Sequence, residues 1–150
     1  MEPLAFLLGT WRGGGQGEYP TIEPFAYSEE TLFWHVGKPF LAYSQRAGAL
    51  EDESLLHSEM GYWLNQSTSD IELVLAQPGG RTEIEIGALT GKRVDLVTQS
   101  IGRTATAKEV SRVERSMEVV GDLLVYDLRM AAVGIPLTHH VHAELRRVEP

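Results

Sequence analysis

The stretch PGGRTEIEIGALTGKRVDL, residues 78–96, decides the fold class of this chain. It holds two short segments in which apolar and polar residues alternate, at 82–86 and at 93–96, and glycine-containing turns precede both. Alternation with a period of two gives a β-strand one buried face and one face in water, as in an antiparallel sheet. The stretch therefore predicts two strands of such a sheet, joined by a tight turn.

The first of these segments also predicts which side chains face the core. Ile84 and Ile86 lie on one face of the strand, and Glu83 and Glu85 lie on the other. Because apolar side chains normally occupy the buried face, we expect the isoleucines to face inward and the two glutamates to face solvent. On this interpretation the glutamates are not a catalytic carboxylate pair.

The same pattern continues outward along the whole chain. Turn residues recur roughly every 8–12 residues, a spacing typical of many short strands. Ten strands are predicted, at residues 11–18, 24–36, 39–49, 55–65, 70–77, 81–89, 92–102, 108–119, 122–132 and 137–148, and one short helix at Pro3–Leu8. Short turns favour hairpins between neighbouring strands, and closure of the sheet removes its exposed edges. We therefore expect an all-β fold, a single ten-stranded antiparallel up-and-down barrel formed by one domain, residues 1–150. Such a barrel is wide enough to hold an apolar ligand inside.

Composition excludes several classes of protein. The chain has 13 Lys and Arg against 21 Asp and Glu, a net charge of −8, which argues against partners such as nucleic acid or acidic lipid surfaces. It contains no Cys, which excludes disulfides and thiolate chemistry. No apolar run approaches the roughly 20 residues that cross a bilayer, and no basic segment precedes an apolar one near Glu2. We expect a soluble cytoplasmic protein without a membrane partner.

A glycine-rich motif surrounds Trp11 near the beginning of the chain. The spacing Gly-x-Trp-x-Gly-x-Gly is formed by Gly9, Trp11, Gly13 and Gly15. It lacks the Gly-Lys-Ser/Thr ending of a phosphate-binding loop, and no strand–helix frame surrounds it. We expect a structural motif, in which Trp11 closes one end of the barrel and the glycines permit close packing of the backbone.

Histidines are the residues that point most directly to chemistry. His139, His140 and His142 crowd the last predicted strand, whereas His35 and His57 stand alone. A zinc site would need a further ligand from elsewhere in the fold, but a haem needs only one imidazole and an apolar slot. On the residues alone, a polar strand end with exposed histidines is an equal alternative.

Three stretches together resemble the nitrobindin family of haem-binding β-barrels. They are GTWRGGGQGEYPTI at residues 9–22, YSEE at 27–30 leading to HVGKP at 35–39, and MAAVGIP at 130–136 followed by HVHAEL at 140–145. The resemblance keeps its order over nearly the whole chain. It implies a barrel related to lipocalins and fatty-acid-binding proteins, holding one haem b per chain. It also implies isomerisation of peroxynitrite to nitrate by ferric haem and reversible binding of nitric oxide. A carrier or sensor of haem, nitric oxide or another apolar ligand is the alternative. A homodimer is possible.

The resemblance also assigns roles to single residues. It makes His140 the axial ligand of the haem iron and hence the catalytic residue, places Thr21 beside the haem, and gives Lys108 to a propionate. Strict alternation opposes the first assignment, because Val141 and Ala143 would then face inward and His140 outward. We expect one of two explanations: the apolar residues of this strand point outward under a covering element, or a β-bulge near His140 turns its side chain inward.

Overall fold

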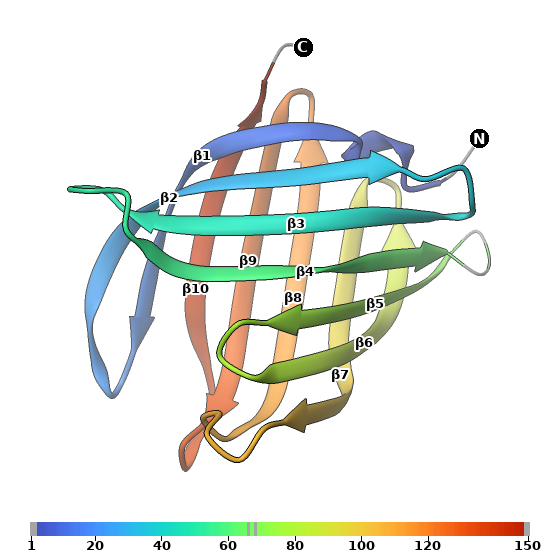
Figure 1. The fold of residues 1–150 in the computed structure, drawn as a ribbon. Helices are drawn as coiled ribbons and strands as arrows, with labels where there is room; N and C mark the ends of the chain where they lie inside the picture. The colour runs from blue at the N-terminus through green and yellow to red at the C-terminus, as the bar shows by residue number, and fades with distance from the viewer. Residues whose placement is uncertain (1–2, 66, 68, 149–150) are drawn as a thin grey trace.

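The computed structural model describes residues 3–65, 67 and 69–148, and it confirms the predicted barrel (Figure 1). A short 3₁₀ turn is followed by ten strands: η1 (Ala5–Leu7), β1 (Gly9–Tyr19), β2 (Ile22–His35), β3 (Phe40–Ala49), β4 (Leu55–Asn65), β5 (Asp70–Gln77), β6 (Arg81–Thr90), β7 (Arg93–Arg103), β8 (Val110–Val120), β9 (Leu123–Ala132) and β10 (Ile135–Arg147). Each predicted strand agrees with an observed one to within two residues at either end. The predicted helix at Pro3–Leu8 is only the single turn η1.

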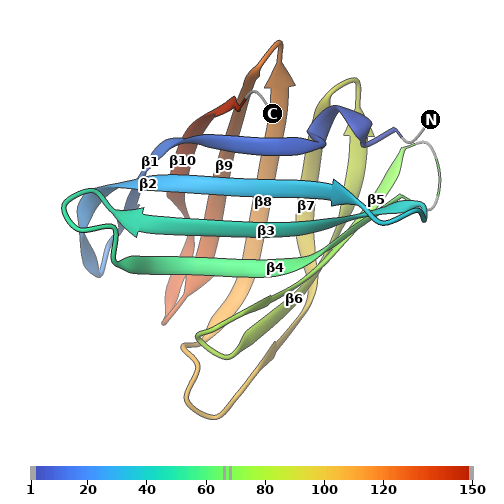
Figure 2. The same ribbon diagram turned by 45° about the horizontal axis from the view of Figure 1, so that its top comes forward.

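Closure of the barrel depends on the pairing of the first and last strands. Every strand pairs antiparallel with its sequence neighbour, and β10 pairs antiparallel with β1. Gly13 lies opposite Leu145, and a Cβ atom at Gly13 would lie 2.2 Å from the carbonyl oxygen of Glu144. The missing side chain therefore allows the two backbones to approach closely. Figures 1 and 2 show β1 to β4 passing across β8 to β10, so these two sets of strands form opposing walls.

η1 lies at one end of the barrel (Figure 2). Buried apolar side chains pack around it there. Trp11 is fully buried there, and its indole N–H donates to the carbonyl oxygen of Leu7 at 2.8 Å. The guanidinium carbon of Arg147 lies 4.1 Å from the centre of the Trp11 ring, and the same group donates to the carbonyl oxygen of Phe6 at 2.9 Å. Trp11 and Arg147 thus fasten η1 across this end of the barrel.

The orientation expected for β6 is wrong. Glu83 and Glu85 are buried, with exposed fractions of 1% and 0%, whereas Ile84 and Ile86 are 38% and 37% exposed. The inward face of β6 lies against the buried guanidinium of Arg115 on β8. Because this group is positively charged, carboxylates are suitable partners for it. Alternation correctly predicted two faces, but the usual preference of apolar residues for the inside does not hold in this part of the barrel. No helix among the described residues is long and apolar enough to cross a membrane.

Candidate functional site

The barrel contains a cavity of about 780 Å³ that reaches the end opposite η1. Two of the predicted site residues line its mouth: Thr21 in the turn between β1 and β2, and Lys108 in the loop between β7 and β8. His140 on β10 also lines it, so the fold brings these three residues to one cavity. Much of the wall near them is apolar, formed by Ile22, Phe25, Val110, Leu128, Met130, Val133 and Val141.

A β-bulge places His140 in this cavity. The register between β9 and β10 shifts between His139 and Val141, so His140 is an extra residue in β10. His140 and Val141 consequently both line the cavity, although they are adjacent in sequence. Of the two explanations expected from the sequence, the bulge is the one observed.

The His140 imidazole is held by one ring nitrogen. Its Nδ1–H donates to the backbone carbonyl oxygen of Glu18 at 2.9 Å, and the Tyr19 ring packs edge-on against it with centroids 5.4 Å apart. Burial lowers the pKa of His140 below its usual value of 6.5. The ring is therefore neutral at pH 7, and its Nε2 atom carries a lone pair.

The neighbouring histidines have different surroundings. His139 contacts Glu18 through Nδ1 at 3.2 Å and Asp127 through Nε2 at 3.1 Å. His142 contacts Asp127 through Nδ1 at 2.8 Å and Glu144 through Nε2 at 3.0 Å. The hydrogen bonds to Glu144 and Asp127 raise the pKa of His142. Both nitrogens of both rings are engaged by carboxylates, so neither ring offers a free lone pair.

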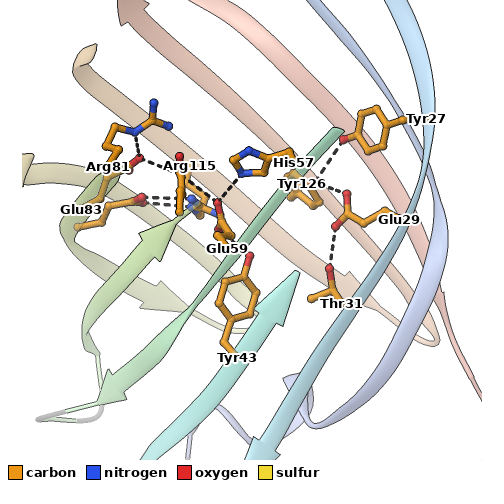
Figure 3. Close-up of polar contacts among 12 residues, drawn as sticks. Tyr27, Glu29, Thr31, Tyr43, His57, Glu59, Arg81, Glu83, Arg115 and Tyr126 are labelled. Atoms are coloured by element: carbon orange, nitrogen blue, oxygen red, sulfur yellow. Dashed lines mark hydrogen bonds and ion pairs between the residues drawn. The ribbon is translucent and has the colours of Figure 1, made fainter. Parts of the chain in front are cut away.

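A buried polar network lies deeper in the barrel (Figure 3). The guanidinium of Arg115 donates two hydrogen bonds to Glu85, at 3.1 and 3.2 Å, and one to Glu59, at 3.1 Å. The hydroxyl of Tyr43 and the Nε2–H of His57 also donate to Glu59, at 2.8 and 3.1 Å. Arg115, Glu59 and Glu85 are each less than 5% exposed, so their hydrogen bonds are made within the protein and not to water.

The two carboxylates that contact Arg115 differ in protonation. Burial by itself raises the pKa of Glu59, but the Arg115 charge and the hydrogen bond from His57 outweigh it and hold the pKa well below the usual range. Burial raises the pKa of Glu85 to about 8, against the opposing effect of Arg115 and with a further contribution from Glu83. At pH 7 Glu59 is therefore ionised and Glu85 is mostly protonated.

A second polar cluster lies around Glu29, between β2 and β9. Glu29 on β2 accepts hydrogen bonds from Tyr126 and from Thr31, the latter at 2.7 Å, and the Tyr27 and Tyr126 hydroxyls are 3.3 Å apart. Burial raises the pKa of Glu29. Tyr27, Tyr43, Glu59, Arg115 and Tyr126 also line the cavity, so its inner part is polar although much of its mouth is apolar.

Sequence reasoning did not assign Arg115, Glu59 or His57 to the site, although one signal for the network was visible. Arg115 lies on the face of its strand that Val113 and Met117 define as buried. A charged residue on a buried face requires a buried partner of opposite charge. The partners cannot be identified from sequence spacing, because Glu59 and Glu85 lie 56 and 30 residues away along the chain.

Trp11 and Gly13 of the glycine-rich motif lie apart from Arg115, Glu59 and His57. Trp11 is at the end of the barrel filled by η1, and Gly13 lies in the seam between β1 and β10. Gly15 is packed against the Tyr27 ring, where a Cβ atom would lie 2.5 Å from Cζ, and Gly9 adopts a φ angle of +120°. Every one of these positions is explained by packing or backbone conformation.

Fold and site together define a β-barrel protein with an interior cavity suited to a ligand. A family model described as a THAP4-like, heme-binding beta-barrel domain matches residues 1–147. The chain belongs to this family, and the resemblance to the haem-binding nitrobindin barrels is confirmed.

Named relatives cover nearly the whole chain. A protein of Mycobacterium marinum named peroxynitrite isomerase 2 is 54% identical over 98% of this chain and 94% of its own length. A peroxynitrite isomerase of Nocardia farcinica is 53% identical over 98% of this chain and 90% of its own. The crystal structure of Rv2717c from M. tuberculosis superposes with a TM-score of 0.91 at 49% identity, covering 97% of this chain and 95% of the other.

Proposed function

We propose that this chain is a haem-dependent peroxynitrite isomerase that also binds nitric oxide, with one haem b per chain. The observation that carries the proposal is His140, a neutral imidazole in the cavity wall with Nδ1 engaged and Nε2 available. The names of relatives about half identical to this chain support the reaction. When bound, the haem supplies an electrophilic ferric iron, and the protein supplies the axial ligand and the shape of the site.

The surroundings of His140 are those expected of a histidine that would hold the haem iron. Iron-binding histidines usually donate their second ring N–H to a carbonyl or carboxylate oxygen, which fixes the tautomer and the orientation of the ring. The hydrogen bond to the Glu18 carbonyl does this for His140. Because burial lowers the pKa of His140, protons do not compete with iron for Nε2 at pH 7.

The remaining walls fit a flat apolar ring with charged edges. Phe25, Leu128 and Met130 give it apolar contacts, and burial of that surface contributes roughly 25 cal/mol per Å². Lys108 at the mouth provides a cation for a propionate, and Thr21 provides a hydroxyl beside the ring. When haem is bound, these side chains would shield its apolar surface from water.

Reconstitution with hemin tests the assignment of His140. Of the three histidines on β10, we expect only His140→Ala to lose the histidine-ligated absorption spectrum and the peroxynitrite isomerase activity, because among these three only the His140 ring has an uncommitted nitrogen. The matched controls are His139→Ala and His142→Ala, which should retain both properties. Loss in His139→Ala with retention in His140→Ala would show that the assignment is displaced by one residue.

Rapid mixing with peroxynitrite separates an enzyme from a carrier. An isomerase converts peroxynitrite to nitrate faster than the buffer does at catalytic amounts of haem protein, whereas a carrier binds haem or nitric oxide without turnover. The same preparation, titrated with nitric oxide, tests the second activity. A cytoplasmic location, the possible homodimer and the absence of nucleic-acid and membrane partners stay predictions.

A further inference from the structure

His57 lies on the wall of the cavity that faces His140. The closed strand order places three strands between β10 and β4 on one side and five on the other, so the two histidines come from nearly opposite positions around the barrel. Both side chains line the same cavity. The His57 side chain is 43% exposed, so a small molecule that enters the mouth can reach it.

The buried network fixes the orientation of the His57 ring. Its Nε2–H donates to Glu59 Oε1 at 3.1 Å, and within the described part of the chain this is the one hydrogen bond that the ring makes. Nδ1 is therefore the nitrogen left for a ligand. Glu59 cannot turn away, because Arg115 and Tyr43 both donate to its other oxygen, at 3.1 and 2.8 Å. Figure 3 shows His57, Arg115 and Tyr43 gathered around this carboxylate.

From this arrangement we infer that His57 hydrogen-bonds the small oxyanion substrate on the side of the haem away from His140, and that Glu59 is its positioning residue. An imidazole that donates to a carboxylate from one nitrogen has a fixed ring orientation, so its other nitrogen points in a defined direction. A protonated ring donates from Nδ1 to an anion, and a neutral ring accepts from a protonated ligand. The inference rests on the proposed function, because it takes the haem to lie between the two histidines.

The Arg115 charge explains how Glu59 can hold the His57 ring as an ionised carboxylate inside the barrel. An isolated buried carboxylate would take up a proton, and the resulting carboxyl group could turn its own O–H toward the ring instead of accepting from it. Arg115 keeps Glu59 ionised. We therefore expect removal of the Glu59 charge to weaken anion binding even though His57 itself is unchanged.

Fluoride binding to the hemin-reconstituted protein tests the inference without measuring turnover. Fluoride is a small anion that binds ferric haem and accepts hydrogen bonds, so an optical titration at about pH 5, where imidazole rings carry two protons, reports the Nδ1–H donor. Hydrogen bonds to charged groups are strong enough that His57→Leu should weaken fluoride binding by about tenfold or more. Glu59→Gln should also weaken fluoride binding. The control His35→Leu, at an exposed residue at the end of β2, should bind fluoride like the unaltered protein.

The haem spectrum distinguishes the possible failures. We expect His57→Leu to retain the histidine-ligated spectrum, because His140 is unchanged. Unaltered fluoride affinity in His57→Leu with that spectrum present would overturn the inference and leave the proposed function intact. Loss of haem from His57→Leu, but not from His35→Leu, would also overturn it, since His57 would then serve haem retention. If the unaltered protein takes up no haem, the proposed function itself fails.

Discussion

At the scale of the residue, the charge balance around Arg115 decides how the inner barrel is protonated. One guanidinium contacts two buried carboxylates, Glu59 and Glu85. Glu59 also accepts from Tyr43 and His57, whereas Glu85 lies beside Glu83, another carboxylate. A single positive charge compensates one of the two, so Glu59 stays ionised and Glu85 keeps its proton.

This difference predicts a pH dependence of stability. The pKa of Glu85 is raised from 4.5 to about 8 in the folded chain, so between these values the folded chain holds a proton that the unfolded chain has lost. Glu85 therefore makes the free energy of unfolding decrease as pH rises from about 5 to 8, by at most about 1.4 kcal/mol per pH unit. Urea unfolding at a series of pH values measures this slope.

Glu85→Gln should remove the contribution, because an amide does not titrate. The difference between its stability curve and that of the unaltered protein should therefore change with pH over this range. Glu51→Gln, at an exposed turn residue, is the matched control and should leave the slope unchanged. Parallel curves for Glu85→Gln and the unaltered protein from pH 5 to 8 would contradict the assigned protonation.

At the scale of the element, close approach of β1 and β10 closes the sheet, and the bulge in β10 then sets the site. Gly13 gives the seam its tight contact, because any Cβ atom there would overlap the Glu144 carbonyl group. Further along the same strand, the extra residue at His140 lets β10 keep Ala143 and Leu145 in the core while His140 faces the cavity. One strand thus contributes both to the core and to the cavity wall.

Gly13→Ala tests the seam. Adding a methyl group 2.2 Å from a backbone oxygen forces β1 and β10 apart, and overpacking of this kind typically costs about 1–3 kcal/mol. Chemical denaturation should show a loss of this size. Gly79→Ala is the matched control, because a Cβ atom at Gly79 has no neighbour within 4 Å. Equal stabilities of the two variants would mean that the seam tolerates a side chain.

At the scale of the whole molecule, packing and binding occupy opposite ends of the barrel. The end around η1 is filled by apolar side chains that include Leu4, Leu7 and Trp11, all at most 1% exposed. The other end holds the cavity with Thr21, Lys108 and His140. The end around η1 is therefore closed by packing, and the other end holds a cavity that is large enough for a ligand.

Trp11→Ala separates these two roles. The indole is fully buried and hydrogen-bonded to Leu7, so its removal leaves a large void and should lower the free energy of unfolding by about 3–5 kcal/mol. Haem affinity, measured below the unfolding transition, should change much less. If stability were unchanged while hemin binding was lost, Trp11 would be a binding residue.

The sequence by itself determined the strands, the turns and the order of pairing. Alternation and turn residues act over a few neighbouring positions, and short connections leave little choice of partner, so all ten strands were predicted to within two residues. Local pattern also indicated Arg115 as a charge on a buried face, without identifying its partners.

Only the tertiary structure decided which way two decisive sets of side chains point. Glu85 faces inward, where a guanidinium from β8 reaches it past β7, a contact between residues 30 positions apart. Glu83 on the same face accepts from Arg81 and Gln77. His140 faces inward because β10 gains a residue relative to β9, and the carbonyl of Glu18, 122 positions away, then receives its Nδ1–H. Neither the partner charge nor the register of an adjacent strand is encoded in the local alternation of one segment.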